Sequence, residues 1–162
     1  MLNVFKNATV ISVMPAMGKT FFAAKFPVFF RDLESSDYHW TEVNGEKVVN
    51  PDWPKNYIDA IKNLEKSGMY KAVFVSSHEL VREEMKKAGI RYANLCPVNT
   101  NSMRQEILAR CVSRKNTAEF INNYNKHWED YINSMLNDDG AVAVVQIDEL
   151  NLKNWANWAA MF

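Results

Sequence analysis

The sequence predicts an α/β fold in which helices cover both faces of a five-stranded parallel sheet, a three-layer sandwich. Five short runs rich in β-branched or aromatic residues are separated by helical segments, and that alternation is typical of parallel sheets. The chain has 162 residues, 48% of them hydrophobic and 23% charged, which is enough apolar mass for a core. We expect a single domain over residues 1–162, because the length is too short for a (β/α)8 barrel of about 250 residues.

The strands are expected where apolar runs are bounded by turn-forming residues. The first run reads ATVISVM and ends at Pro15, and the second lies between Pro27 and the polar pair Arg31-Asp32. The remaining runs read KAVFVS, RYANLCP and AVAVVQI. Continuous apolar runs of this length favour buried strands. The five expected strands are residues 8–14, 28–30, 71–76, 91–97 and 141–147.

The helices are expected where apolar residues recur at helical spacing. Pro54 stands where a helix accepts proline in its first turn, and Gly68 and Gly89 mark helix ends. Asn116 and Glu119 resemble a capping box that opens one long helix, whose apolar stripe is interpreted as core packing. The polar stretch 34–53 carries only an expected turn at Asn44-Gly45. The expected helices are residues 18–26, 54–67, 79–88, 102–115, 116–135 and 150–162.

Composition excludes several classes of protein. The 19 basic and 19 acidic residues balance, so stable nucleic-acid binding is not expected. No apolar stretch approaches the ~20 residues of a membrane span, and the first residues do not resemble a secretory signal. The two cysteines, Cys96 and Cys111, are too few for a disulfide scaffold. We therefore expect a cytoplasmic protein without a membrane partner.

Charge is uneven along the chain. Residues 82–115 contain eight basic and three acidic residues, a net charge of +5. These charges either lie on solvated helix faces or build an anion site, for which the planar fork of arginine suits phosphate.

The turn after the first expected strand carries the most specific pattern. Residues 13–20 read VMPAMGKT, against the phosphate-loop pattern G-x-x-x-x-G-K-[ST]. In that pattern Lys19 reaches the terminal phosphates of ATP and the Thr20 hydroxyl ligates Mg²⁺, while backbone N–H groups bind the anion. Val13 replaces the first glycine, and is strained only if its φ must be positive. An ordinary βα turn is the alternative. The expected ATP-binding residues of the turn are Pro15, Ala16, Met17, Gly18, Lys19 and Thr20.

Further candidates lie at the carboxyl ends of other strands, where α/β sheets bind ligands. Asp32 is expected to orient an acceptor group or a metal-bound water, unless it is a helix cap or turn aspartate; Glu34 is a weaker candidate. Arg82 is expected to clamp an acceptor phosphate, with a surface ion pair to Glu79 or Glu83 as the alternative.

The expected helix 102–115 carries three arginines. Arg110 and Arg114 are four residues apart and share a face. Arg104 projects on the apolar side in the first turn, where it either binds phosphate or extends its head group to solvent.

Other side chains have two open interpretations. For His39 and His78 a hydrogen-bonded structural role is favoured over catalysis, because no second metal ligand stands at suitable spacing. Trp40, Trp53 and Tyr57 either stack on a nucleotide base or simply pack.

Four motifs together resemble the small phage and prophage P-loop kinases of the nucleoside monophosphate kinase, adenylate-kinase-like type. They are MPAMGKT at 14–20, DLESS at 32–36, NPDWPKNY at 50–57 and VSSHELVR at 75–82, followed by the arginine-rich helix. The resemblance covers roughly residues 9–136. It departs at Val13 and Ala16, where glycine is usual, and at Ser76-Ser77, where many P-loop enzymes carry an acidic residue. That last departure leaves Mg²⁺ to Thr20, phosphates and water.

The resemblance implies a P-loop NTPase-type sandwich with an arginine-bearing lid over about 100–118. It implies transfer of the γ-phosphoryl group of ATP to a nucleoside monophosphate, with a deoxynucleotide expected, in the host cytoplasm if the protein is phage-encoded. Nucleotides are the expected partners, and a homodimer is possible. In this scheme Arg104 binds ATP, while the residues expected to take part in transfer are Lys19, Asp32, Arg82, Arg110 and Arg114.

Two alternatives stay open at this point. The same fold serves other acceptors, such as a nucleoside, a polynucleotide 5′ end or a small metabolite. The chain could instead be a non-catalytic nucleotide-binding or regulatory protein with a degenerate loop.

Overall fold

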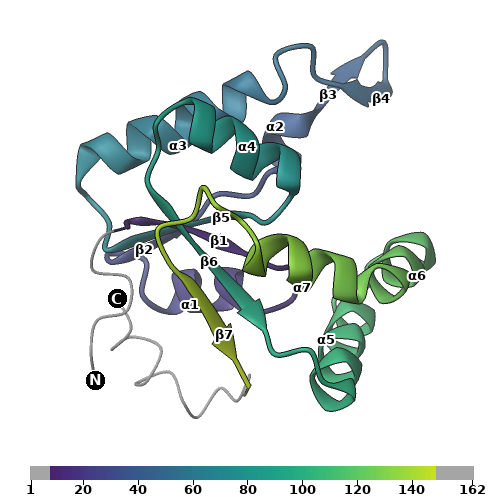
Figure 1. Ribbon diagram of the computed structural model, residues 1–162. Helices are drawn as coiled ribbons and strands as arrows, with labels where there is room; N and C mark the ends of the chain where they lie inside the picture. Colours follow the sequence, from purple (N-terminus) through teal and green to yellow (C-terminus); the bar gives the residue numbers. More distant parts are fainter. Residues whose placement is uncertain (1–7, 149–162) are drawn as a thin grey trace.

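The computed structural model describes residues 8–148, and a five-stranded, all-parallel sheet forms their centre (Figure 1). The strand order is β2-β5-β1-β6-β7, and every neighbouring pair is parallel, as the sequence predicts. The carboxyl ends of all five strands therefore meet at one edge of the sheet. The strands are β1 Val10–Val13, β2 Phe30–Asp32, β5 Ala72–Ser76, β6 Tyr92–Pro97 and β7 Val144–Ile147.

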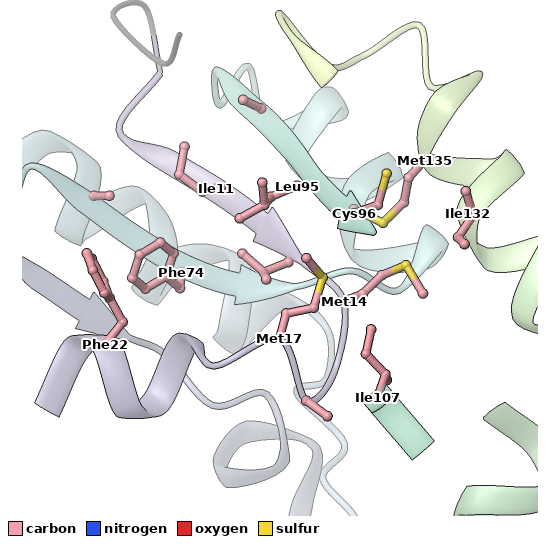
Figure 2. Close-up of a cluster of buried hydrophobic side chains, with 14 of the residues drawn as sticks. Ile11, Met14, Met17, Phe22, Phe74, Leu95, Cys96, Ile107, Ile132 and Met135 are labelled. Carbon is pink, nitrogen blue, oxygen red and sulfur yellow. The ribbon is translucent and has the colours of Figure 1, made fainter. Parts of the chain in front are cut away.

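Helices cover both faces of this sheet. Alternate residues of a strand point to opposite faces, and the two buried clusters divide in that way. Val73 and Val75 of β5 pack with α3 and α4, whereas Ala72 and Phe74 pack on the other face with α1, α5 and α7. Figure 2 shows the cluster that contains Phe74. The helices are α1 Lys19–Lys25, α2 Ser36–His39, α3 Lys55–Ser67, α4 Glu79–Lys87, α5 Asn101–Ser113, α6 Ala118–Lys126 and α7 Trp128–Leu136.

The second strand begins later than predicted. The amides of Phe29 and Phe30 both donate to the Phe26 carbonyl, so a turn closes α1 and leaves Val28 and Phe29 exposed before the strand. β2 then runs from Phe30 to Asp32. As a consequence, Asp32 is the last residue of the strand and is held in register opposite Phe74 of β5.

The long helix predicted from residue 116 to 135 is wrong, because the structure has two helices there. Thr117, rather than Asn116, caps α6, and its hydroxyl accepts from the Phe120 amide at 3.2 Å. His127 leaves helical geometry, with φ −104° and ψ 19°, and separates α6 from α7. The break redirects the apolar stripe, so that Trp128 in α7 is buried in the core against the sheet.

The polar stretch after β2 contains a hairpin that the sequence analysis did not predict. Strands β3 (Trp40–Val43) and β4 (Glu46–Val49) form a separate two-stranded antiparallel sheet, which projects from the body in Figure 1. Its turn lies at Asn44-Gly45, as predicted, and both residues have positive φ, 53° and 81°. Such a turn matches the twist of a two-residue hairpin.

Two expectations concern other parts of the chain. The helix expected over 150–162 lies outside the described residues. Within the described range, no helix combines the length and apolar character that a membrane crossing requires. Cys96 and Cys111 are buried free thiols.

Candidate functional site

Two adjoining pockets open at the carboxyl edge of the sheet. The loop pocket has a volume of about 530 Å³ and lies between the turn after β1, the segment after β2 and the C-terminus of α5. The aromatic pocket, of about 550 Å³, lies between α2, the start of α4, α6 and α7. The residues that line both pockets are Pro15, Ser77, His78 and Phe120.

The turn after β1 has left-handed backbone geometry at two residues. Gly18 has φ 93°, and Ala16 has φ 62° although it carries a Cβ. Val13 is the last residue of β1, is 1% exposed and does not have positive φ, so valine is unstrained there. Of the two departures from glycine, only Ala16 therefore stands at a position that favours glycine.

The side chains of this turn divide between the core and the pockets. Ala16 and Met17 are buried in the core cluster, whereas Pro15 lines both pockets. The Tyr124 hydroxyl of α6 donates to the Pro15 carbonyl at 3.2 Å. The sequence analysis assigned Tyr124 to core packing alone, and it thus missed a contact that joins α6 to the loop.

Lys19 begins α1 and lines the loop pocket. Its side chain is only 8% exposed, yet it has no hydrogen bond or ion pair with any described residue. Burying an ammonium group without a partner is costly. An anion in the loop pocket would supply that partner.

The side chains of Thr20 and Asp32 contact each other close to the turn after β1. The Thr20 hydroxyl donates to Oδ2 of Asp32 at 2.5 Å, and the other carboxylate oxygen, Oδ1, is buried with no hydrogen-bond partner among the described residues. Hard oxygen ligands of this kind suit Mg²⁺. The described residues contain no group of three His, Cys, Asp or Glu placed to hold a metal. Thr20 and Asp32 therefore fit a magnesium ion that takes its remaining ligands from phosphates and water.

Two arginines, Arg110 in the last turn of α5 and Arg114 directly after it, lie near the turn that follows β1. Nη1 of Arg110 is 3.9 Å from the position that a Cβ on Gly18 would occupy, and Nη2 pairs with Glu106 at 3.0 Å. Arg114 follows the last residue of α5 and lines the loop pocket together with Lys19. Of this pair, only Arg114 lines the loop pocket, whereas Arg110 lies next to Gly18 in the turn and lines neither pocket.

Arg104 lies elsewhere. Its guanidinium donates to the Asn125 side chain at 2.7 Å and to the Asn125 carbonyl at 3.0 Å, and so it joins α5 to α6. It lines neither pocket. The structure therefore does not bring Arg104 to the turn where the sequence analysis expected it to bind phosphate.

Arg82 is buried in the wall of the aromatic pocket, with 4% exposure. Its Nη1 donates to Asp138 at 2.6 Å, and further bonds reach the Ser77 carbonyl and both the carbonyl and hydroxyl of Ser134. The alternative of a surface ion pair with Glu79 or Glu83 is wrong. Arg82 is instead fixed between α4 and α7.

Asp138 is the counter-ion of Arg82, and the sequence analysis missed it. Asn94 and Tyr92 of β6 also donate to its carboxylate, at 2.9 and 3.1 Å. Burial alone would raise the pKa of Asp138, but the hydrogen bonds from Asn94 and Arg82 outweigh it and hold that pKa below its ordinary value.

Aromatic rings face the aromatic pocket from two groups of elements. His39 stacks between Trp40 and Trp53, at centroid distances of 4.5 and 4.7 Å. From α6 and α7, Phe120 and Tyr131 each stack on Tyr124, at 5.9 Å. A planar ligand in this pocket would therefore meet ring faces contributed by both groups.

Tyr57 positions the ends of two strands. Its buried hydroxyl donates to the Leu33 carbonyl at 2.7 Å and accepts from the Ser76 amide at 3.1 Å, so it joins the carboxyl ends of β2 and β5. Burial raises the pKa of this hydroxyl above its ordinary value, which keeps the group protonated. The only sequence signal for this role is a tyrosine in an otherwise aliphatic helix stripe.

A comparison with protein-family models found no match, and a search of the curated proteins found no similar sequence.

Proposed function

We propose that this chain is a P-loop-type kinase that transfers the γ-phosphoryl group of ATP to a (deoxy)nucleoside monophosphate. The observation that carries the proposal is the buried Lys19 next to the Thr20–Asp32 pair: within residues 8–148, neither the Lys19 ammonium nor the second carboxylate oxygen of Asp32 has a polar partner. A lysine in the loop pocket, followed in the chain by a threonine that contacts a carboxylate with one unsatisfied oxygen, forms a set of groups that a magnesium–triphosphate would complete.

The donor phosphates are assigned to the loop pocket. Phosphoryl transfer depends on positioning and on stabilising negative charge, more than on covalent chemistry. Lys19, Arg110 and Arg114 would supply positive charge, while Thr20 and Asp32 would hold the metal. When bound, Mg²⁺ neutralises charge on phosphate oxygens.

The acceptor is assigned to the aromatic pocket. Its ring faces are suited to a base, because stacking on aromatic side chains is favourable for any base. Arg82 stands in the same pocket with its guanidinium held rigidly by Asp138 and Ser134. Because Arg82 and the stacked aromatic rings line the same pocket, we favour an acceptor with a base that stacks on the rings and a phosphate that lies near the arginine.

The test is to incubate the protein with ATP, Mg²⁺ and each ribo- and deoxyribonucleoside monophosphate in turn, and to detect diphosphate products by mass spectrometry. We expect ADP and one or a few matched diphosphates. Lys19→Ala should strongly reduce the formation of both products. Lys66→Ala, which replaces an exposed lysine in the last turn of α3, should not. Transfer only to nucleosides, polynucleotide ends or metabolites would contradict the acceptor class, and ATP binding without transfer would favour a regulatory role.

A further inference from the structure

His78 stands where the two pockets join. It follows the end of β5, immediately precedes α4, and lines both the loop pocket and the aromatic pocket. In the proposed reaction the transferred group must pass between these pockets. The position of His78 is therefore at the meeting point of the donor and acceptor phosphates.

The imidazole of His78 makes no polar contact within residues 8–148. Neither ring nitrogen forms a hydrogen bond or ion pair with the residues that the structure describes, and the side chain does not cap α4. The hydrogen bond expected for a structural His78 is therefore not found within the described part of the chain. Both ring nitrogens remain available to a ligand.

The charges that act most strongly on the pKa of His78 are positive. Loss of solvent against the pocket walls lowers the pKa of the ring, even though part of it is exposed, and His39, Arg82 and Lys19 lower it further. The other charged or titratable residues that line the two pockets are Glu34, Glu79, Arg114, Tyr124, Asp130 and Tyr131. In the empty site at neutral pH, the ring is therefore neutral.

We propose that His78 is a positioning residue that donates a hydrogen bond to the phosphate of a phosphomonoester acceptor and takes up one proton from solvent as that phosphate binds. The inference rests on the proposed function for the identity of the acceptor. The phosphate dianion reverses the local field that Lys19 and Arg82 create, and so it favours the charged imidazolium. Unlike Arg82, which is always charged, His78 would make acceptor affinity depend on pH.

The sign of that dependence follows from linkage. Phosphate binding raises the pKa of His78. The affinity for the dianion should therefore increase as the pH falls from the pKa of His78 in the bound protein to its pKa in the free protein. Phosphomonoesters themselves take up a proton near pH 6, and measurements between about pH 6.5 and 8.5 separate the two effects.

The direct test is an NMR titration of the three histidine rings, with inorganic phosphate as the first probe and the accepted nucleoside monophosphate as the second. We expect the pKa of His78 to rise by about one unit, which corresponds to about tenfold tighter binding to the protonated protein. His127, which pairs with Asp130 and lines neither pocket, serves as the internal reference. An unchanged His78 titration at saturating monophosphate overturns the inference.

Variants give a second readout. His78→Gln keeps a neutral donor, so it should raise KM for the monophosphate several-fold and remove its pH dependence, with KM for ATP unchanged. His127→Gln is the matched control, because His127 lines neither pocket and is not among the groups that shift the pKa of His78, so the pH dependence should stay in place. If His78→Gln retains the parental pH profile, the inference is wrong.

The two hypotheses fail separately. A His78 pKa that rises with phosphate in a protein that transfers no phosphoryl group supports the phosphate contact and contradicts the kinase. Transfer to a monophosphate without a response of His78 contradicts the phosphate contact and supports the kinase.

Discussion

Replacing Asp138 by asparagine should destabilise the fold strongly, because it leaves a buried positive charge without a counter-ion. The side chains of Arg82 and Asp138 are 4% and 9% exposed, and their charged atoms are 2.6 Å apart. Removing one partner of a buried pair costs about 3–5 kcal/mol. That is a large fraction of the 5–15 kcal/mol by which domains are typically stable.

The neighbouring residue provides a matched control. Asp139 forms an ion pair of the same length with Lys86, but its side chain is 85% exposed. Asp139→Asn should leave the free energy of unfolding nearly unchanged, since solvent and salt screen exposed pairs. Urea unfolding of the parent and the two variants, followed by circular dichroism, measures both effects.

Two further measurements test the electrostatic cause. Adding Arg82→Met to Asp138→Asn should recover part of the loss, because the unpaired charge is then gone. The Asp138 contribution should be present at neutral pH and disappear as pH falls below the ordinary pKa of 3.8 and through the lowered folded value. If Asp138→Asn costs no more than Asp139→Asn, the carboxylate does not hold Arg82 in the way that the structure indicates.

Four other variants address the loop pocket and the turn after β1. Lys19→Ala should lower turnover at least ~100-fold, about 2.7 kcal/mol of transition-state stabilisation, with an intact fold and no loss of thermal stability; turnover within a few-fold of the parent would contradict a donor site. Replacing both Arg110 and Arg114 by alanine should reduce kcat/KM far more than it reduces the melting temperature, and the reverse result would make these arginines structural. Ala16→Gly should leave stability unchanged or raise it by up to about 1 kcal/mol, because relief of left-handed strain (about 1–2 kcal/mol) offsets the lost methyl burial (about 0.8 kcal/mol). Val13→Gly should instead cost about 2–4 kcal/mol in the same urea experiment, since it empties a buried position in a strand.

The features that could be predicted from the sequence depend on local pattern. Apolar runs between turn residues identified the five strands of the parallel sheet. Because ligands bind at the carboxyl ends of such strands, the sequence also predicted that Lys19, Thr20 and Asp32 lie at one edge of the sheet. The predicted start of β2 was wrong because residues 26–30 form a turn, in which the Phe26 carbonyl accepts hydrogen bonds from the Phe29 and Phe30 amides. The apolar run 28–30 does not reveal this turn. The hairpin strands were missed because most of their residues are exposed, and so no core selects an alternating pattern.

The remaining features depend on contacts between distant segments. Arg82 and Asp138 are 56 positions apart, and nothing near either residue identifies the other as its partner. Tyr124 belongs to an apolar stripe and, by that criterion, is an ordinary core residue; its bond to the Pro15 carbonyl depends on how α6 crosses the loop. For Arg104 the sequence analysis expected a phosphate ligand, because the residue is an isolated charge on the apolar side of a helix. In the structure, its guanidinium instead donates to Asn125 of the neighbouring helix α6.

The β3–β4 hairpin has a consequence for how this chain can be altered. It forms its own backbone ladder, and the Asn50 amide closes its base by donating to the His39 carbonyl at 2.7 Å. Trp40, its first residue, is the one part of the hairpin that lines the loop pocket. The tip at Asn44-Gly45 therefore offers a site for insertions or for a fluorescent label, because exposed turns tolerate added residues. Three residue pairs of the β3–β4 ladder would separate a reporter at the tip from the pair Trp40–Val49, whose tryptophan lines the loop pocket.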